Sequence, residues 1–302
     1  MILVAGATGS IGTHLVRLLL DQGVAFKALV RDEAKGRALG CDVVAGDFDE
    51  PASLPAAMDG VDTLFLNAGG AQPVEGEQPM IRQQKAAIDA ARAAGVSEVV
   101  KVSVWGAHRG GRLAEGAHWE IEEYVKASGL GWSMLRPSGF MQNFITGAGA
   151  FTADGKLIDA YGGAGVSYID CHDIAACAAA LLTGSHGTGS HRLGETYVLT
   201  GPRALTAAET ARELSAALGR PVGHVEVSPD DLAAALRSRG LPAQFVDDFA
   251  ELCREVAAGS LAATTTAVRD LTGRSPRTFA EFLAANAEAL RAGLLSTASP
   301  NV

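Results

Sequence analysis

Along the first 135 residues, short apolar runs alternate with segments in which apolar residues recur every three or four positions. The apolar runs predict buried strands at 2–5, 24–30, 42–45, 61–66, 98–104 and 132–135. The helical spacing predicts helices at 10–22, 53–58, 80–94 and 119–127. Strands that are apolar on both faces and alternate with helices are typical of a parallel sheet covered on both sides. The fold class expected is therefore α/β, a doubly wound parallel sheet.

Beyond Pro137 this alternation weakens. Residues 154–165 are rich in glycine and indicate a loop. Short strands are predicted at 167–169 and 196–199, and a helix at 174–182. After residue 206 the pattern is mostly helical. We expect a nucleotide-binding domain at 1–148 and a smaller, mostly helical substrate lobe at 149–295 that is partly interleaved with it.

Composition narrows the class of protein. The chain has 302 residues, 48% hydrophobic and 20% charged, which excludes a largely disordered chain. Its 25 basic residues are dispersed and outnumbered by 34 acidic ones, so no nucleic-acid partner is expected. No apolar stretch outside the N-terminus is long enough to span a bilayer, and the four cysteines form no CxxC pair. A cytoplasmic protein with no membrane partner, a monomer or homodimer, is the expectation.

The sequence GATGSIG, residues 6–12, follows the first strand and opens the first helix. Gly6 permits a tight turn, Gly9 lets the backbone approach a pyrophosphate, and Gly12 lets helix and strand pack closely. The N–H groups of Thr8, Ser10 and Ile11 and the helix dipole complete an anion site. Because strand, glycine triplet and helix all agree, this loop predicts dinucleotide binding.

The same loop, with RDEAK after the second strand, GDFDE after the third and NAG after the fourth, resembles the atypical short-chain dehydrogenase/reductases. Two further segments, KVSVWGA and ASGLGWSMLRPSGFMQN, narrow the resemblance to the NmrA-like group. Within that group the chain is similar to the type 2 quinone reductases. It covers most of residues 1–182, including YIDCHDIA near its end. It implies a Rossmann fold that binds NAD(P), and it says little about the substrate.

Arg31 stands at the end of the second strand, where Rossmann folds read the adenosine ribose. Arginine there, with Lys35 one helical turn later, favours the 2′-phosphate of NADP. NAD stays possible, because Asp32 is able to bind its ribose and Arg31 is able to serve as a solvated surface charge. The cofactor expected is NADP, with NAD as the alternative.

The resemblance implies further cofactor contacts. Asp47 and Phe48 are expected to flank the adenine, although Asp47 also suits a helix cap before Pro51. The remaining residues expected near the nicotinamide and its ribose are Asn67, Ala68, Gly69, Val102, Ser103 and Pro137.

The acid pair that short-chain dehydrogenases carry on the helix after the fifth strand, a tyrosine and a lysine four residues later, is absent here. His118 and Glu122 stand at the corresponding positions. Reducing a ketone creates an alkoxide whose conjugate acid has a pKa of about 16, against about 10 for a phenol, a difference of roughly 8 kcal/mol. The missing pair therefore favours a quinone or conjugated acceptor over a ketone. His118 and Ser103 are the expected catalytic residues; a surface histidine and a strand-ending hydroxyl are the alternatives.

Aromatic and polar residues follow the fifth and sixth strands, where open α/β sheets bind ligands. The residues expected to contact substrate are Trp105, His108, Phe140, Asn143, Phe144 and Tyr161, with Met141 beside them. Plain core packing is the alternative for Trp105. Asp170, His172 and Asp173 have the spacing of a helix cap, so no metal is assigned.

Three functions compete. The first is NAD(P)H-dependent transfer of hydride to a quinone or conjugated aromatic carbonyl, such as a secondary metabolite. The second is a non-catalytic NAD(P) redox sensor that regulates a partner protein, which the missing tyrosine and lysine also suit. The third, sugar-nucleotide epimerisation, needs the tyrosine and is the weakest.

Overall fold

A computed structural model describes residues 1–146, 151–184 and 193–296. Its chain divides into two compact units, and each consists of several segments of the sequence. The first unit comprises Met1–Pro137, Cys171–Leu199 and Thr266–Arg274, and the second comprises Ser138–Asp170, Thr200–Thr265 and Ser275–Val302. The boundary expected at residue 148 falls in 147–150, outside the described residues.

The first unit is built on a seven-stranded sheet in which every pair of neighbours is parallel. The strands are β1 (Ile2–Val4), β2 (Phe26–Val30), β3 (Val43–Ala45), β4 (Thr63–Leu66), β5 (Glu98–Val102), β6 (Gly131–Pro137) and β8 (Glu195–Leu199). Their order is β3-β2-β1-β4-β5-β6-β8, which contains the doubly wound Rossmann order 3-2-1-4-5-6. The expected fold class is confirmed.

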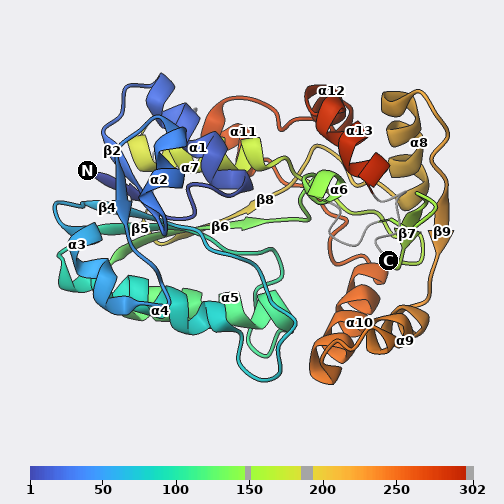
Figure 1. The fold of residues 1–302 in the computed structure, drawn as a ribbon, viewed down its shortest axis with the longest axis horizontal. Helices are drawn as coiled ribbons and strands as arrows, with labels where there is room; N and C mark the ends of the chain where they lie inside the picture. Colours follow the sequence, from blue (N-terminus) through green and yellow to red (C-terminus); the bar gives the residue numbers. More distant parts are fainter. Residues whose placement is uncertain (147–150, 185–192, 297–302) are drawn as a thin grey trace. The chain divides into compact units, whose positions relative to one another are not determined.

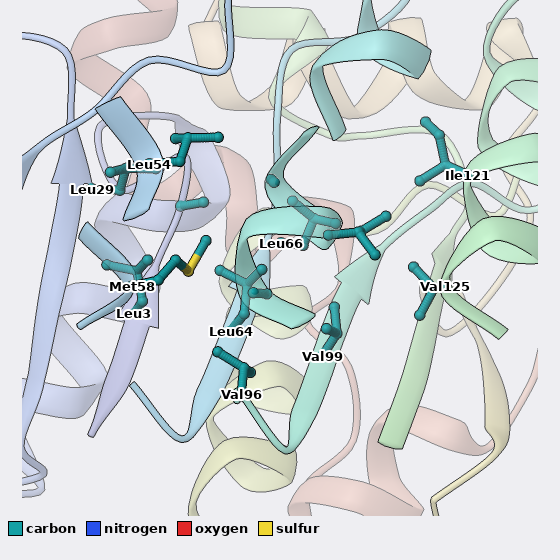
Figure 2. Close-up of a cluster of buried hydrophobic side chains, with 14 of the residues drawn as sticks. Leu3, Leu29, Leu54, Met58, Leu64, Leu66, Val96, Val99, Ile121 and Val125 are labelled. Atoms are coloured by element: carbon teal, nitrogen blue, oxygen red, sulfur yellow. The ribbon is translucent and has the colours of Figure 1, made fainter. Parts of the chain in front are cut away.

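Helices cover both faces of this sheet (Figure 1). On one face lie α3 (Leu54–Met58), α4 (Pro79–Ala93) and α5 (Leu113–Ala127), and on the other α1 (Ser10–Asp21), α7 (Cys171–Thr183) and α11 (Ala267–Thr272). Short turns of helix also occur at α2 (Glu33–Gly36), Arg37–Leu39 and Pro51–Ser53. Figure 2 shows the core between the sheet and α3–α5, where Leu64 and Val99 of the strands meet Met58, Ile121 and Val125 of the helices.

The second unit is mostly helical. It contains α6 (Asn143–Thr146), α8 (Ala207–Leu218), α9 (Pro229–Ser238), α10 (Ala243–Ala257), α12 (Phe279–Ala285) and α13 (Ala287–Ser296), with a two-stranded parallel sheet of β7 (Leu157–Asp159) and β9 (His224–Glu226). Its core holds Phe144, whose ring packs edge to face against the rings of Tyr168 and Phe279. The distances between ring centroids are 5.0 Å to Tyr168 and 5.1 Å to Phe279.

Three local predictions are wrong. Residues 154–165 contain strand β7, because Leu157 and Asp159 are buried and pair with β9. Residues 167–169 form no strand, since only single bridges at Val166 and Ile169 occur there. Helix α5 begins at Leu113 instead of residue 119, although Arg112 supplies no side-chain cap and Gly116 lies within it. In the described part of the chain, no helix has the length and apolar character needed to cross a membrane.

Candidate active site

The glycine turn after β1 is shaped by close backbone approaches. Gly6 has a φ of +67°, in the left-handed region, and a Cβ placed there would lie 2.7 Å from the carbonyl oxygen of Asn67. A Cβ on Gly12 would lie only 2.1 Å from the carbonyl oxygen of Gly6. The turn is closed by the N–H of Gly9, which donates to the oxygen of Gly6 at 3.0 Å. Two of the three glycines are therefore required by sterics, and Asn67 lies against the loop.

The amino end of α1 is open toward solvent. Gly9 is its N-cap, no side chain caps it, and its first turn contains no acidic residue. Thr8, Gly9 and Ser10 are exposed, whereas Ile11 and Gly12 are buried against the sheet. A helix start that presents N–H groups without a carboxylate suits the pyrophosphate of a dinucleotide.

The end of β2 carries two exposed cations, Arg31 and Lys35. Between them, the carboxylate of Asp32 caps α2 by accepting from the N–H groups of Ala34 at 2.9 Å and Lys35 at 3.3 Å. The acid that would serve the ribose of NAD is thus engaged by its own helix. This arrangement suits an extra phosphate on the coenzyme better than a bare ribose.

After β3, the Asp47 carboxylate accepts from the N–H of Asp49 at 3.0 Å. It does not cap the turn at Pro51–Ser53, whose N-cap is Glu50. Hydrogen bonds from Arg82 and Gln83 lower the pKa of Asp49, and the positive charge of Arg31 acts in the same direction. Phe48 is half-buried against the core. After β4, Ala68 is half-buried and Gly69 exposed.

Five polar side chains interrupt the apolar layer between the sheet and α5. We call them the buried polar cluster: Lys101, Ser103, His118, Glu122 and Arg136. Their placement follows from periodicity. Val99 and Met134 belong to the core facing α5, and side chains two and four positions further along a strand point to the same face. On α5, positions four apart share one face, which aligns His118 with Glu122.

Glu122 is the centre of one half of the cluster. Its side chain is 0% exposed and accepts from Arg136, with Nε to Oε1 at 2.9 Å and Nη2 to Oε2 at 2.6 Å. The hydroxyl of Ser103 donates to the same Oε1 at 2.5 Å. The Ser103 proton is therefore directed at Glu122.

Lys101 and His118 form the other half. Lys101 is 0% exposed and His118 is 7% exposed. Nζ of Lys101 lies 2.8 Å from Nδ1 of His118, within hydrogen-bond distance, and donates to the carbonyl oxygen of Val102 at 3.0 Å. Burial lowers the pKa of Lys101 to about 7; the charge of Glu122 opposes that shift and Arg136 adds to it. Burial, with the positive charges of Lys101 and Arg136, holds the pKa of His118 well below 6.5, so its ring is neutral.

Sequence reasoning named Ser103 and His118 but missed Lys101 and Arg136. A signal existed in each case. Lys101 lies within the apolar run EVVKV and Arg136 within a strand, and a charged residue on the inner face of a buried strand needs a partner.

The remaining predicted residues lie on both units. In the first unit, Val102 and Pro137 are buried and His108 is exposed. Trp105 is half-buried, and its backbone N–H donates to the carbonyl oxygen of Pro137 at 2.8 Å. In the second unit, Phe140 is half-buried and Asn143 exposed, whereas Phe144 is only 5% exposed within the core. Burial raises the pKa of Tyr161 to about 12.

The acidic residues around 170–173 are engaged by other side chains. Asp170 accepts from Gln142 at 2.7 Å and from Arg277 at 3.2 Å, all in the second unit. Asp173 lies 3.4 Å from Nδ1 of His172. Among the described residues, no group of histidine, cysteine or acidic side chains has the arrangement of a metal site.

Comparison with known proteins identifies the family of this chain. A family profile described as NAD(P)H-binding matches residues 6–184, and the chain belongs to that family. The NAD(P)H azoreductase of Xenophilus azovorans is 40% identical over 297 residues, 97% of this chain and 100% of the relative. A (4-alkanoyl-5-oxo-2,5-dihydrofuran-3-yl)methyl phosphate reductase of Streptomyces griseus is 34% identical, over 96% of this chain and 99% of the relative.

Among solved structures, the NADPH-dependent quinone oxidoreductase of Escherichia coli in complex with NADPH superposes with a TM-score of 0.79. It is 30% identical, and the match covers 94% of this chain and 99% of that one. The protein is an NAD(P)H-dependent oxidoreductase with a Rossmann fold.

Proposed function

We propose that this protein transfers hydride from NADPH to a quinone or a comparably conjugated aromatic acceptor, azo compounds included. The observation that carries the proposal is that α5 lacks the tyrosine and lysine with which related dehydrogenases donate a proton. Their two positions hold a neutral His118 and a Glu122 locked to Arg136, and neither reproduces a tyrosine activated by a lysine. An acceptor that yields a phenolate-like anion needs far less stabilisation than a ketone. The names of the azoreductase and quinone oxidoreductase relatives are consistent with such acceptors.

In this proposal the coenzyme is held by the first unit. The amino end of α1 and the turn at Gly6, Gly9 and Gly12 bind the pyrophosphate, and Arg31 with Lys35 binds the 2′-phosphate. When bound, the reduced nicotinamide supplies the hydride. Val102 and Pro137 at the ends of β5 and β6 exclude water from its surroundings by their burial.

For the acceptor, Trp105 offers a half-buried aromatic surface after β5, and His108 an exposed polar group. Phe140, Asn143 and Tyr161 stay predictions as acceptor-binding residues of the second unit. Phe144 is not part of the proposal, because its ring is packed against Tyr168 and Phe279.

We further propose a cytoplasmic location. All four cysteines are free thiols, and Cys171, Cys177 and Cys253 are buried, which suits a reducing compartment.

The test is oxidation of NADPH and of NADH, followed at the nicotinamide absorbance, with 1,4-naphthoquinone, a sulfonated azo dye and an aliphatic ketone. We expect turnover of the quinone and the dye, a preference for NADPH, and no turnover of the ketone. Efficient ketone reduction would overturn the acceptor assignment. Tight NADPH binding without turnover of any acceptor would instead favour the redox sensor.

A further inference from the structure

Lys101 and His118 form a hydrogen-bonded pair in the layer between the sheet and α5. Lys101 has no exposed surface, while His118 keeps 7%, so His118 is the member of the pair that retains some access to the surface. As an ammonium group Lys101 is able only to donate, so in that state Nδ1 of the ring accepts and the proton of the neutral ring resides on Nε2. The ring thus presents an N–H donor on the side away from the lysine.

The charged groups on the face of the sheet that Lys101 occupies come from α5 and β6, while α7, with His172 and Asp173, packs against the opposite face of β5. Helix α5 contributes His118 and Glu122, with Lys126 lying 3.9 Å from Oε2 of Glu122, and β6 contributes Arg136. Strand β4, on the other side of β5, presents the uncharged residues 63–66. Both oxygens of Glu122 accept from Arg136, and Oε1 also from Ser103, whereas the Lys101 amine is hydrogen-bonded to two uncharged groups, the His118 ring and the carbonyl oxygen of Val102.

We propose that Lys101 and His118 form the proton-donating couple of the reductase, with His118 as the catalytic residue that touches the acceptor and Lys101 as the positioning residue that supplies its proton. The inference rests on the proposed function and names the group that protonates the phenolate-like anion left by hydride transfer.

The step balances as follows. NADPH provides the hydride and its two electrons to the quinone, which leaves a negative oxygen. Nε2–H of His118 gives its proton to that oxygen while Nδ1 takes a proton from the Lys101 ammonium. The ring stays neutral and changes tautomer, Lys101 becomes a neutral amine, and water returns the proton through the ring before the next turnover. Because the ring gains one proton as it loses another, no imidazolate has to form. A neutral histidine without Lys101 would become an imidazolate when it gave up this proton.

The acidity of the couple suits this acceptor. A lysine whose pKa is about 7 protonates a phenolate-like anion of pKa about 10 with an equilibrium advantage of roughly a thousandfold. Ser103 does not compete for this role, because its hydroxyl proton already donates to Glu122 at 2.5 Å.

The experiment compares the pH dependence of naphthoquinone reduction at saturating NADPH in the wild type, Lys101→Met and Lys126→Met. In the wild type, kcat is expected to fall as the pH rises through about 7, because the ammonium form is consumed. Lys101→Met is expected to lose about 10²-fold in kcat and to lose this pH dependence. Lys126→Met removes a cation beside the same Glu122 without touching His118, and its profile is expected to match the wild type.

Two measurements separate this role from simple misfolding. NADPH affinity by calorimetry is expected to be unchanged in Lys101→Met. In the coenzyme-free protein, ¹⁵N NMR of His118 is expected to show the Nε2–H tautomer below neutral pH, with a perturbation near pH 7 that Lys101→Met abolishes. A Lys101→Met enzyme with wild-type rate and pH profile, or a His118 ring protonated on Nδ1 below pH 7, would overturn the couple. If the wild type reduces no quinone, the proposed function fails, and the NMR result still decides whether the couple exists.

Discussion

Arg136 binds Glu122 through two parallel hydrogen bonds, 2.9 Å from Nε to Oε1 and 2.6 Å from Nη2 to Oε2. This fork joins β6 to α5 at the position where a related dehydrogenase would carry its catalytic lysine. The carboxylate is fully buried while the arginine keeps a 21% exposed side chain, so the charge of Glu122 depends on its partner more than the charge of Arg136 does. The pair is a structural element of the site.

Glu122→Ala is expected to lower the free energy of unfolding by about 3–5 kcal/mol, because it leaves Arg136 in a largely buried place without its partner. The matched control is Glu123→Ala on the same helix. Glu123 is exposed and pairs with the exposed end of Lys126, so a change within about 0.5 kcal/mol is expected. Urea denaturation of both variants measures the difference, and equal losses would show that the buried fork contributes nothing.

The stability of the wild type is expected to rise with pH between about 7 and 10. In that window the unfolded chain binds a proton on Lys101 that the folded protein has released, since burial lowers this pKa from 10.5 to about 7. The slope reaches at most about 1.4 kcal/mol per pH unit for one proton. Lys101→Met should lack this rise. Thermal or urea denaturation at several pH values measures the free energy of unfolding of both proteins. Identical slopes of this free energy against pH would contradict the lowered pKa of Lys101.

Gly9 and Gly12 are expected to respond differently to substitution. A Cβ on Gly9 lies at a tolerable 3.4 Å from the oxygen of Gly6, and aspartate is a good helix N-cap, so Gly9→Asp should fold at least as stably as the wild type. Its carboxylate would repel the pyrophosphate and weaken NADPH binding roughly 10²–10³-fold. Gly12→Ala should instead destabilise the fold by about 1–3 kcal/mol through its overlap with Gly6 and Ala7. Calorimetric affinity and denaturation distinguish the two effects.

Arg31→Ala is expected to weaken the binding of NADPH by about 1.5–3 kcal/mol, because a hydrogen bond to a charged group is lost. The binding of NADH is expected to change little. Arg17→Ala, an exposed arginine on α1, serves as the control and should affect neither coenzyme. Dissociation constants for both coenzymes provide the measurement. A parallel loss for NADPH and NADH would mean that Arg31 acts as a general surface charge.

Much of the first unit was predictable because its signals are local. Apolar runs located all six strands from β1 to β6, and the spacing of Gly6, Gly9 and Gly12 identified the turn whose close approaches are now seen. The boundaries that failed depend on tertiary contacts. The start of α5 at Leu113 has no side-chain cap, and β7 exists only because β9, far along the chain, pairs with it.

The buried polar cluster was half predictable for the same reason. His118 and Glu122 were found together because they stand at the two positions, four residues apart on one helical face, where related dehydrogenases carry a tyrosine and a lysine. Lys101 and Arg136 reach them from two strands that lie side by side in the sheet, and that adjacency is set by the register of β5 with β6. Periodicity shows which side of a strand a residue occupies; it does not show which residue of a distant helix stands opposite.

The division of the chain also bears on biosynthesis. The polypeptide passes from one unit to the other after Pro137, Asp170, Leu199, Thr265 and Arg274, so neither unit exists as a continuous stretch of sequence. During synthesis the sheet of the first unit stays without its edge strand β8 until residue 199 has been made, and without α11 until residue 272. A ribosome-bound fragment ending near residue 148 would leave the flank of β6 unpaired and open to association with other chains. The reductase is thus a protein that completes its coenzyme-binding half only when nearly all of the chain has been translated.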